Sequence, residues 1–345
     1  METFKAYKLS FDVQVETTVQ LNEHQGSAIR GAFYHTLRRM YCMNPKMKTC
    51  SDCPLASVCT VAFLTSTMDP NSDRGRDIPR PYTIQPPLPG SGHPKTLPGG
   101  RLVYEYAPGE RFSFGMTFFD KAIQAFPYLL LAVYEMGRGG LGRRMRRENG
   151  RYLRGRIRLL SARCENPISG QSQEVLNTGT RMAEIPVVPI THQQIASLPV
   201  PKGDLLIRFL TPTRLTYSVD FKKRVVHPGG FTFRRFFQRL ADRLDYLGKY
   251  FSDGGPDWGD FRALLAAAEK VEVVENRLRW ADVWSYSSRK RAFSPIGGIL
   301  GEVVLRAEDW SPFWPWIVWG QFMHVGKDAV KGNGVYEAVN GGVRD

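Results

Sequence analysis

The stretch GDLLIRFLTPTRLTY, residues 203–217, has the composition of a β-strand, and FTFRRFFQRLADRLDYLGKYF, residues 231–251, follows it as a basic amphipathic helix. Two strand-like segments come next, at 271–288 and 297–307. A short apolar helix at 311–326 and a last strand at 334–339 complete the series. The order strand, helix, strand, strand, helix, strand is that of a ferredoxin-like domain.

The first half of the chain repeats this order. A strand in residues 3–16 precedes a helix in 23–42, where Ile29, Phe33, Leu37 and Met40 recur at helical spacing. An edge strand near 101–106, a strand at 109–119, a helix at 120–137 and a strand at 151–162 follow. We therefore predict an α+β protein with two tandem ferredoxin-like (RRM-like, βαββαβ) domains.

The expected domain limits follow from the distribution of Pro and Gly. The N-terminal domain covers 1–165 and the C-terminal domain 203–345, with a linker rich in Pro and Gly at 166–202. Two segments interrupt the first domain: a cysteine-rich insertion at 42–59 and a loop at 69–100, where Pro and Gly are too dense for long regular structure.

The charge of the chain indicates its class of partner. The 345 residues include 47 Lys+Arg and 33 Asp+Glu, a net charge of +14, which favours a polyanion and nucleic acid first. An anionic membrane surface is the weaker alternative, because the basic residues do not line one face of an amphipathic helix. The N-terminus lacks a signal-peptide core and no apolar run could span a bilayer, so we expect a cytoplasmic protein.

Four of the five cysteines fall within eighteen residues, in the spacing C-x7-C-x2-C-x5-C: Cys42, Cys50, Cys53 and Cys59. In a reducing compartment, clustered cysteines favour a metal over disulfides. Four thiolates close a tetrahedral site, so we expect structural zinc, with an iron–sulfur cluster as the alternative. Chance clustering stays open, and a redox or radical enzyme would rest on these cysteines alone.

Three basic segments are candidate phosphate-binding sites. The tract at 137–158 carries nine arginines on a glycine-rich frame, including Arg143, Arg144, Arg146 and Arg147. A turn near 289–291 holds Arg289, Lys290 and Arg291, and the C-terminal loop holds Gly326, Lys327, Lys331, Gly332 and Gly334. Each could instead be an ordinary solvated loop. The glycines of GRGGLG do not indicate a dinucleotide site, because they follow a helix and precede a strand.

Several of these segments together resemble one family. LLIRFLTPTRL, FRRFFQRLADRLDYLGKYF, SYSSRKRAFSPIGGILGEVVL and PFWPWIVWGQFMHVGKDAVKGNGVYEA have the order and spacing of the C-terminal half of the CRISPR precursor-RNA processing endoribonucleases, the Cas six branch of the RAMP superfamily. The resemblance covers 204–340 closely. It is looser before that, where GSAIRGAFYHTLRRMYC resembles the family's first helix and the cysteine segment resembles one found in some members.

This resemblance implies two ferredoxin-like domains that bind CRISPR repeat RNA and cut it once without a metal. The 2′-hydroxyl of the RNA would attack the adjacent phosphate, leaving a cyclic phosphate and a 5′-hydroxyl. The product would stay bound in an effector complex with other Cas subunits. The alternative is an inactive RAMP-family subunit that only holds RNA by shape, phosphate contacts and stacking.

The cut needs a base, an acid and cations, and histidine suits either proton role. Of six histidines, His35 lies on the first helix, where many members carry their catalytic histidine, and it shares a side with Arg38 and Arg39. Tyr41 on the same helix and His324 before the glycine loop are further candidates, and Lys46 and Lys48 could supply charge. The family often opens that loop with G-x-G, whereas here only Gly326 is present.

Overall fold

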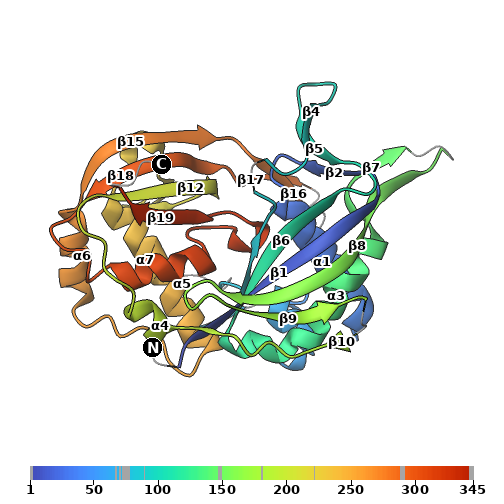
Figure 1. Ribbon diagram of the computed structural model, residues 1–345, viewed down its shortest axis with the longest axis horizontal. Helices are drawn as coiled ribbons and strands as arrows, with labels where there is room; N and C mark the ends of the chain where they lie inside the picture. Colours follow the sequence, from blue (N-terminus) through green and yellow to red (C-terminus); the bar gives the residue numbers. More distant parts are fainter. Residues whose placement is uncertain are drawn as a thin grey trace. The chain divides into compact units, whose positions relative to one another are not determined.

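The computed structural model describes residues 3–66, 68–69, 71, 78–88, 90–146, 150–179, 182–220, 222–287 and 292–341 (Figure 1). The chain forms two compact units. The N-terminal unit is Lys5–Ile190, and the C-terminal unit is Thr191–Asp345 together with Met1–Phe4. In the described part of the chain, no helix combines the length and apolar composition needed to cross a membrane.

The C-terminal unit is a four-stranded antiparallel sheet with two main helices. The strands lie in the order β15-β18-β12-β19, which is second, third, first, fourth along the chain. This is the ferredoxin-like arrangement, and it confirms the prediction. The elements are β12 (Leu205–Thr213), α5 (Phe233–Phe251), β15 (Glu272–Ala281), β18 (Gly298–Arg306), α7 (Trp314–Met323) and β19 (Tyr336–Asn340).

Smaller elements surround this sheet. They are α4 (His192–Ala196), the hairpin of β13 (Thr216–Val219) and β14 (Lys222–Val225), η3 (Pro228–Gly230), α6 (Phe261–Glu269), the hairpin of β16 (Trp284–Ser287) and β17 (Ala292–Pro295), and η4 (Ala329–Lys331). Helix α5 begins where the Thr232 hydroxyl accepts a hydrogen bond from the Arg235 backbone N–H at 3.3 Å. It buries Phe233, Phe236 and Leu240 along one side.

The N-terminal unit has the same strand order, β8-β1-β6-β3. Its repeated elements are β1 (Lys5–Thr17), α1 (Gly26–Tyr41), β3 (Tyr82–Gln85), β6 (Arg111–Phe119), α3 (Phe126–Gly139) and β8 (Tyr152–Asn166). Strands β9 (Gln171–Asn177) and β10 (Met182–Ala183) extend the sheet beyond β8, β7 (Leu141–Arg146) pairs with β8, and β11 (Ile190–Thr191) pairs with β1. A separate sheet joins β2 (Val19–Asn22), β5 (Leu102–Tyr106) and β4 (His93–Thr96), and η1 (Ala56–Val58), α2 (Thr60–Thr65) and η2 (Asp120–Ala125) are short helical turns.

Two predicted boundaries differ from the structure. The second strand of the N-terminal domain is β3, inside the expected loop 69–100, whereas the expected edge strand near 101–106 is β5 of the separate sheet. A four-residue edge strand between prolines carries little sequence signal, since proline is tolerated at strand ends. The expected linker 166–202 also contains β9, which pairs with β8, so the units divide near residue 190.

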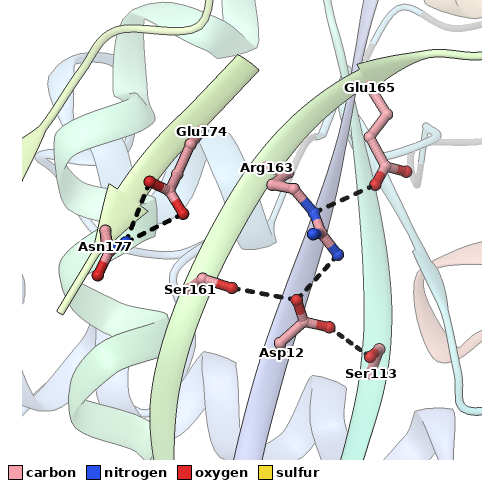
Figure 2. A network of polar contacts seen from close by, with 7 residues as sticks. All are labelled: Asp12, Ser113, Ser161, Arg163, Glu165, Glu174 and Asn177. Atoms are coloured by element: carbon pink, nitrogen blue, oxygen red, sulfur yellow. Dashed lines mark hydrogen bonds and ion pairs between the residues drawn. The ribbon is translucent and has the colours of Figure 1, made fainter. Parts of the chain in front are cut away.

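The two faces of the N-terminal sheet differ in chemistry. Leu9, Phe11, Val13 and Val15 alternate along β1 and are all buried. The intervening side chains form a polar face, where Asp12 accepts hydrogen bonds from Ser113 at 2.5 Å and Ser161 at 3.1 Å and pairs with Arg163 at 3.0 Å (Figure 2). The arginine on this face is therefore already neutralised by a carboxylate.

Candidate functional site

His35 lies on the exposed side of α1, near two arginines of the same helix and one of β8. Desolvation lowers its pKa, and the positive charges of Arg154, Arg30 and Arg38 lower it further. The Tyr34 ring lies edge-on to the imidazole at 5.4 Å and carries the Arg30 guanidinium 5.0 Å above its centre. A neutral imidazole beside several guanidinium groups can take a proton and leave the charge of a phosphate to the arginines.

Arg38 has a different role from the one expected. Its guanidinium donates to the backbone carbonyls of Met47, Pro45 (3.4 Å) and Lys48 (3.5 Å), so it ties the end of α1 to the cysteine segment. Lys46 and Lys48 on that segment are exposed. Arg39 is also exposed, and its guanidinium lies beside Gly139 at the end of α3.

Tyr41 does not join His35. Its ring packs edge-on against Tyr128 at 5.0 Å, and its buried hydroxyl finds no hydrogen-bond partner among the residues that are described. Burial raises the pKa of Tyr41, and Tyr128 and Glu135 raise it further. Residues six apart do not share a helix face, so Tyr41 belongs to the wall of the cysteine cavity.

The four cysteines of the insertion all line one cavity of about 340 Å³, with Tyr41 and Tyr128. None of them is in a disulfide. Within the described ranges, no group of three or more His, Cys, Asp or Glu side chains is arranged to hold a metal ion. The structure thus brings the predicted ligands to one cavity without setting them in a ligating geometry.

The arginine tract 137–158 is not the flexible loop that its glycines suggest. Much of it is the β7–β8 hairpin (Figure 1). Cross-strand pairing sets Arg146 opposite Tyr152. Its glycines allow close packing: at Gly142, with φ +80°, a Cβ would lie 2.2 Å from the Gln20 carbonyl oxygen. Arg144 and Arg146 are exposed, whereas Arg143 is partly buried and burial lowers its pKa. Arg147 lies outside the described residues.

His324, at the start of the glycine loop after α7, is buried in the C-terminal unit. This side chain is 2% exposed, and burial, with the charge of Arg243, lowers its pKa to about 3. Its ring therefore does not reach RNA, contrary to our expectation. Its backbone adopts φ 60° and ψ 167°, a conformation almost confined to glycine, at the position where the family's G-x-G would place one.

The rest of that loop is tightly bonded to the C-terminal unit. Gly334 N–H donates to the Pro212 carbonyl at 3.2 Å, and the Asn333 side chain donates to the Ile296 carbonyl at 2.7 Å. Gly332 and Gly334 are buried, and Lys331 pairs with Asp328 at 2.8 Å. This leaves Gly326 partly exposed and Lys327 as the exposed cation of the loop. Arg289, Lys290 and Arg291 lie outside the described residues.

Two family models match this chain. Residues 207–336 match CRISPR-associated endoribonuclease Cas6, and residues 4–187 match AF_1859_N, described as an N-terminal domain. The chain belongs to the Cas6 endoribonuclease family. No curated protein matches it.

Solved Cas6 structures have the same fold. Thermus thermophilus Cas6 (TTHB231) is 16% identical with a TM-score of 0.52, over 97% of this chain and 99% of that one. The Cas6 (TTHB231) product complex is 18% identical with a TM-score of 0.56, over 97% of this chain and 100% of that one. The partial Cas6-RT-Cas1--Cas2 complex is 13% identical with a TM-score of 0.54, over 98% of this chain and 46% of that chain.

In this Cas6-family chain, sequence analysis missed two residues beside His35. Arg30 precedes it on α1, and its place above Tyr34 could have been found from the four-residue spacing. Arg154 comes from β8, more than a hundred residues away, so only the topology of the sheet brings its charge to the histidine.

Proposed function

We propose that this protein binds CRISPR repeat RNA and cleaves it without a metal ion, using His35 as the general base. The observation that carries this proposal is the exposed His35, whose pKa is lowered and which lies among the charges of Arg154, Arg30 and Arg38. Family membership supports the choice of substrate, and the fold matches that of a Cas6 product complex.

In the proposed reaction the nucleophile and the leaving group both belong to the RNA. The protein supplies proton transfer and positive charge. His35 accepts the proton of the 2′-hydroxyl as its oxygen attacks the adjacent phosphorus. The bond to the 5′-oxygen breaks, and that oxygen takes a proton from solvent water. The products are a 2′,3′-cyclic phosphate and a 5′-hydroxyl. Arg30 and Arg154 would stabilise the negative charge that builds on the phosphate, the task that positioned cations perform in phosphoryl transfer.

The test is cleavage of the host's repeat RNA in EDTA, with the product ends mapped. We expect one cut, and we expect His35→Ala to lower its rate by about 10²- to 10⁴-fold, the usual contribution of general acid–base catalysis, with RNA still bound. Cleavage by His35→Ala at the wild-type rate would show that another residue is the base. Tight binding of RNA that stays intact with the wild type would favour the inactive RNA-holding subunit.

We also propose that the four cysteines bind a structural zinc ion. Their shared cavity and thiolate chemistry support this, and the thiols would have to close on the ion, since they form no ligating group as they lie. Zinc would fix the segment that Arg38 ties to α1 and take no part in the cut. Metal analysis of protein purified without chelators should find one zinc per chain; iron with inorganic sulfide would indicate a cluster, and no metal in folded protein would contradict the site.

We propose that the protein works in the cytoplasm with other Cas proteins. The solved Cas6-RT-Cas1--Cas2 complex, whose fold this chain shares over 46% of the length of that chain, supports such a partnership. Co-purification of tagged protein with Cas subunits and bound RNA from its host would test it.

A further inference from the structure

One face of the β7–β8 hairpin combines exposed cations with an exposed aromatic ring. Arg144 and Arg146 are two apart on β7, and Tyr152 and Arg154 are two apart on β8. Cross-strand pairing sets Arg146 directly opposite Tyr152. Directly paired residues share a face and side chains alternate along each strand, so Arg146, Tyr152 and Arg154 lie on one face. The pairing register shifts between Leu141 and Met145, and Arg144, which is exposed like Arg146, lies within this irregular stretch. We call these four residues the hairpin track.

The hairpin track continues to His35. Strand β7 packs against α1, the helix that carries His35, and the charge of Arg154 lowers the pKa of His35. Positive groups thus run from the proposed base along the hairpin to Tyr152, whose side chain is 64% exposed. All belong to the N-terminal unit, so the track does not depend on the placement of the second unit.

The arginines of the hairpin track have no ion pair among the described residues, unlike others on β8, and Arg154 donates a hydrogen bond to the Gly142 carbonyl. Farther along β8, Arg156 pairs with Glu16 at 3.0 Å. Arg163 pairs with Asp12, also at 3.0 Å (Figure 2). Among the described residues, no carboxylate lies within ion-pair distance of Arg144, Arg146 or Arg154. Exposed guanidinium groups without a counter-charge suit a polyanion, and an exposed tyrosine at their end suits a base.

We propose that the hairpin track binds single-stranded RNA beside the cut site, with Tyr152 stacked on an unpaired base and Arg144 and Arg146 on phosphates. This inference rests on the proposed function and adds the surface that binds the RNA next to the scissile phosphate. Unpaired RNA is the occupant because a base in a duplex is already stacked on its neighbours and cannot offer a face to Tyr152.

The test measures the binding of fluorescent oligouridylate and of the host's repeat RNA by full-length His35→Ala protein, in which we expect cleavage to be slowed by at least about 10²-fold. Adding Tyr152→Ala should weaken oligouridylate binding about tenfold, the usual loss for one stacked base, whereas Tyr152→Phe should retain it. Adding Arg146→Gln should weaken binding and reduce the slope of log K against log salt by about 0.7. Binding to a perfect RNA duplex should not respond to Tyr152→Ala.

The matched controls come from the same unit. Tyr134 on α3 is 38% exposed, and Arg163 on β8 is paired with Asp12, so Tyr134→Ala and Arg163→Gln should bind like the parent. The proposal is overturned if Tyr152→Ala, with an unchanged melting temperature, binds oligouridylate like the parent, or if Arg146→Gln and Arg163→Gln lose equal affinity. Failure of the proposed function would give a different result. The wild-type protein would leave repeat RNA intact, and the oligouridylate affinities of the variants would still show whether the hairpin track binds RNA.

Discussion

The pKa of His35 is lowered first by desolvation and then by the charge of a residue on a distant strand. Arg154 of β8 is the strongest of the charges that lower the His35 pKa. Its replacement by glutamine removes a positive charge that disfavours the imidazolium, so the His35 pKa must rise.

This gives a pH prediction for cleavage. A general base works in its neutral form, so the rate falls as pH drops through the His35 pKa. With Arg154→Gln the acidic limb of the kcat/KM profile should therefore move to higher pH, measured as single-turnover cleavage of repeat RNA between pH 4.5 and 8. Arg163→Gln, whose charge is already paired with Asp12, should leave the limb in place. A limb that moves to lower pH in Arg154→Gln would contradict the role given to this charge.

The exposure of His35 could be predicted from sequence because it depends only on helical spacing, which is a local pattern. This spacing separates Phe33 and Leu37, which are buried, from the exposed histidine. The burial of His324 could not be predicted in this way. Its neighbours in the chain predict a loop next to an anion. In the folded unit the residue is instead buried, and Arg243, far away in the sequence, lies near enough for its charge to lower the His324 pKa.

At the scale of elements, the arginine-rich segment shows how glycine misleads. Gly142 and Gly155 belong to a segment whose composition suggests a flexible loop. A Cβ on either residue, however, would lie within 2.5 Å of a backbone oxygen of the segment 18–20. These glycines let two backbones approach, which produces an ordered hairpin. The second half was predicted more closely because its strands and helices alternate without long insertions, whereas β3 is hidden among prolines.

The glycine loop carries a second pH prediction, for stability. The His324 pKa is about 3 in the folded protein and near 6.5 in an unfolded chain, so between these values the unfolded state binds the extra proton. Stability from this group is complete above about pH 6.5 and falls on acidification, by at most about 1.4 kcal/mol per pH unit.

Replacing His324 tests this. His324→Gly removes the titrating ring and suits the backbone at φ 60°, so it should flatten the loss of unfolding free energy between pH 7 and pH 5. His324→Ala should flatten it as well but be less stable than the glycine variant by about 1 to 3 kcal/mol, because alanine keeps the strained backbone. Urea unfolding at several pH values measures both effects. An undiminished pH slope in His324→Gly would show that other groups cause it.

At the scale of the whole molecule, the net charge of +14 is divided unequally between paired and free cations. Many arginines of the sheet faces are in ion pairs, such as Arg208 with Glu302 at 2.7 Å and Arg306 with Asp204 at 2.7 Å. Six of the cations that the sequence predicts as RNA contacts are exposed and have no carboxylate partner in the described part of the chain: Arg39, Lys46, Lys48, Arg144, Arg146 and Lys327. The charge of these six residues is available for phosphates.

The salt dependence of RNA binding measures how much of that set is used. If all six contact phosphates of single-stranded RNA, log K should fall with log salt at a slope of about −4, so a fourfold rise in salt weakens binding by two to three orders of magnitude. The His35→Ala protein should keep this slope, since its histidine carries little charge at neutral pH. Replacing the paired Arg208 should not change it, whereas Lys327→Gln should reduce it by about 0.7. A slope shallower than about −1 would mean that stacking and hydrogen bonds, and not these cations, hold the RNA.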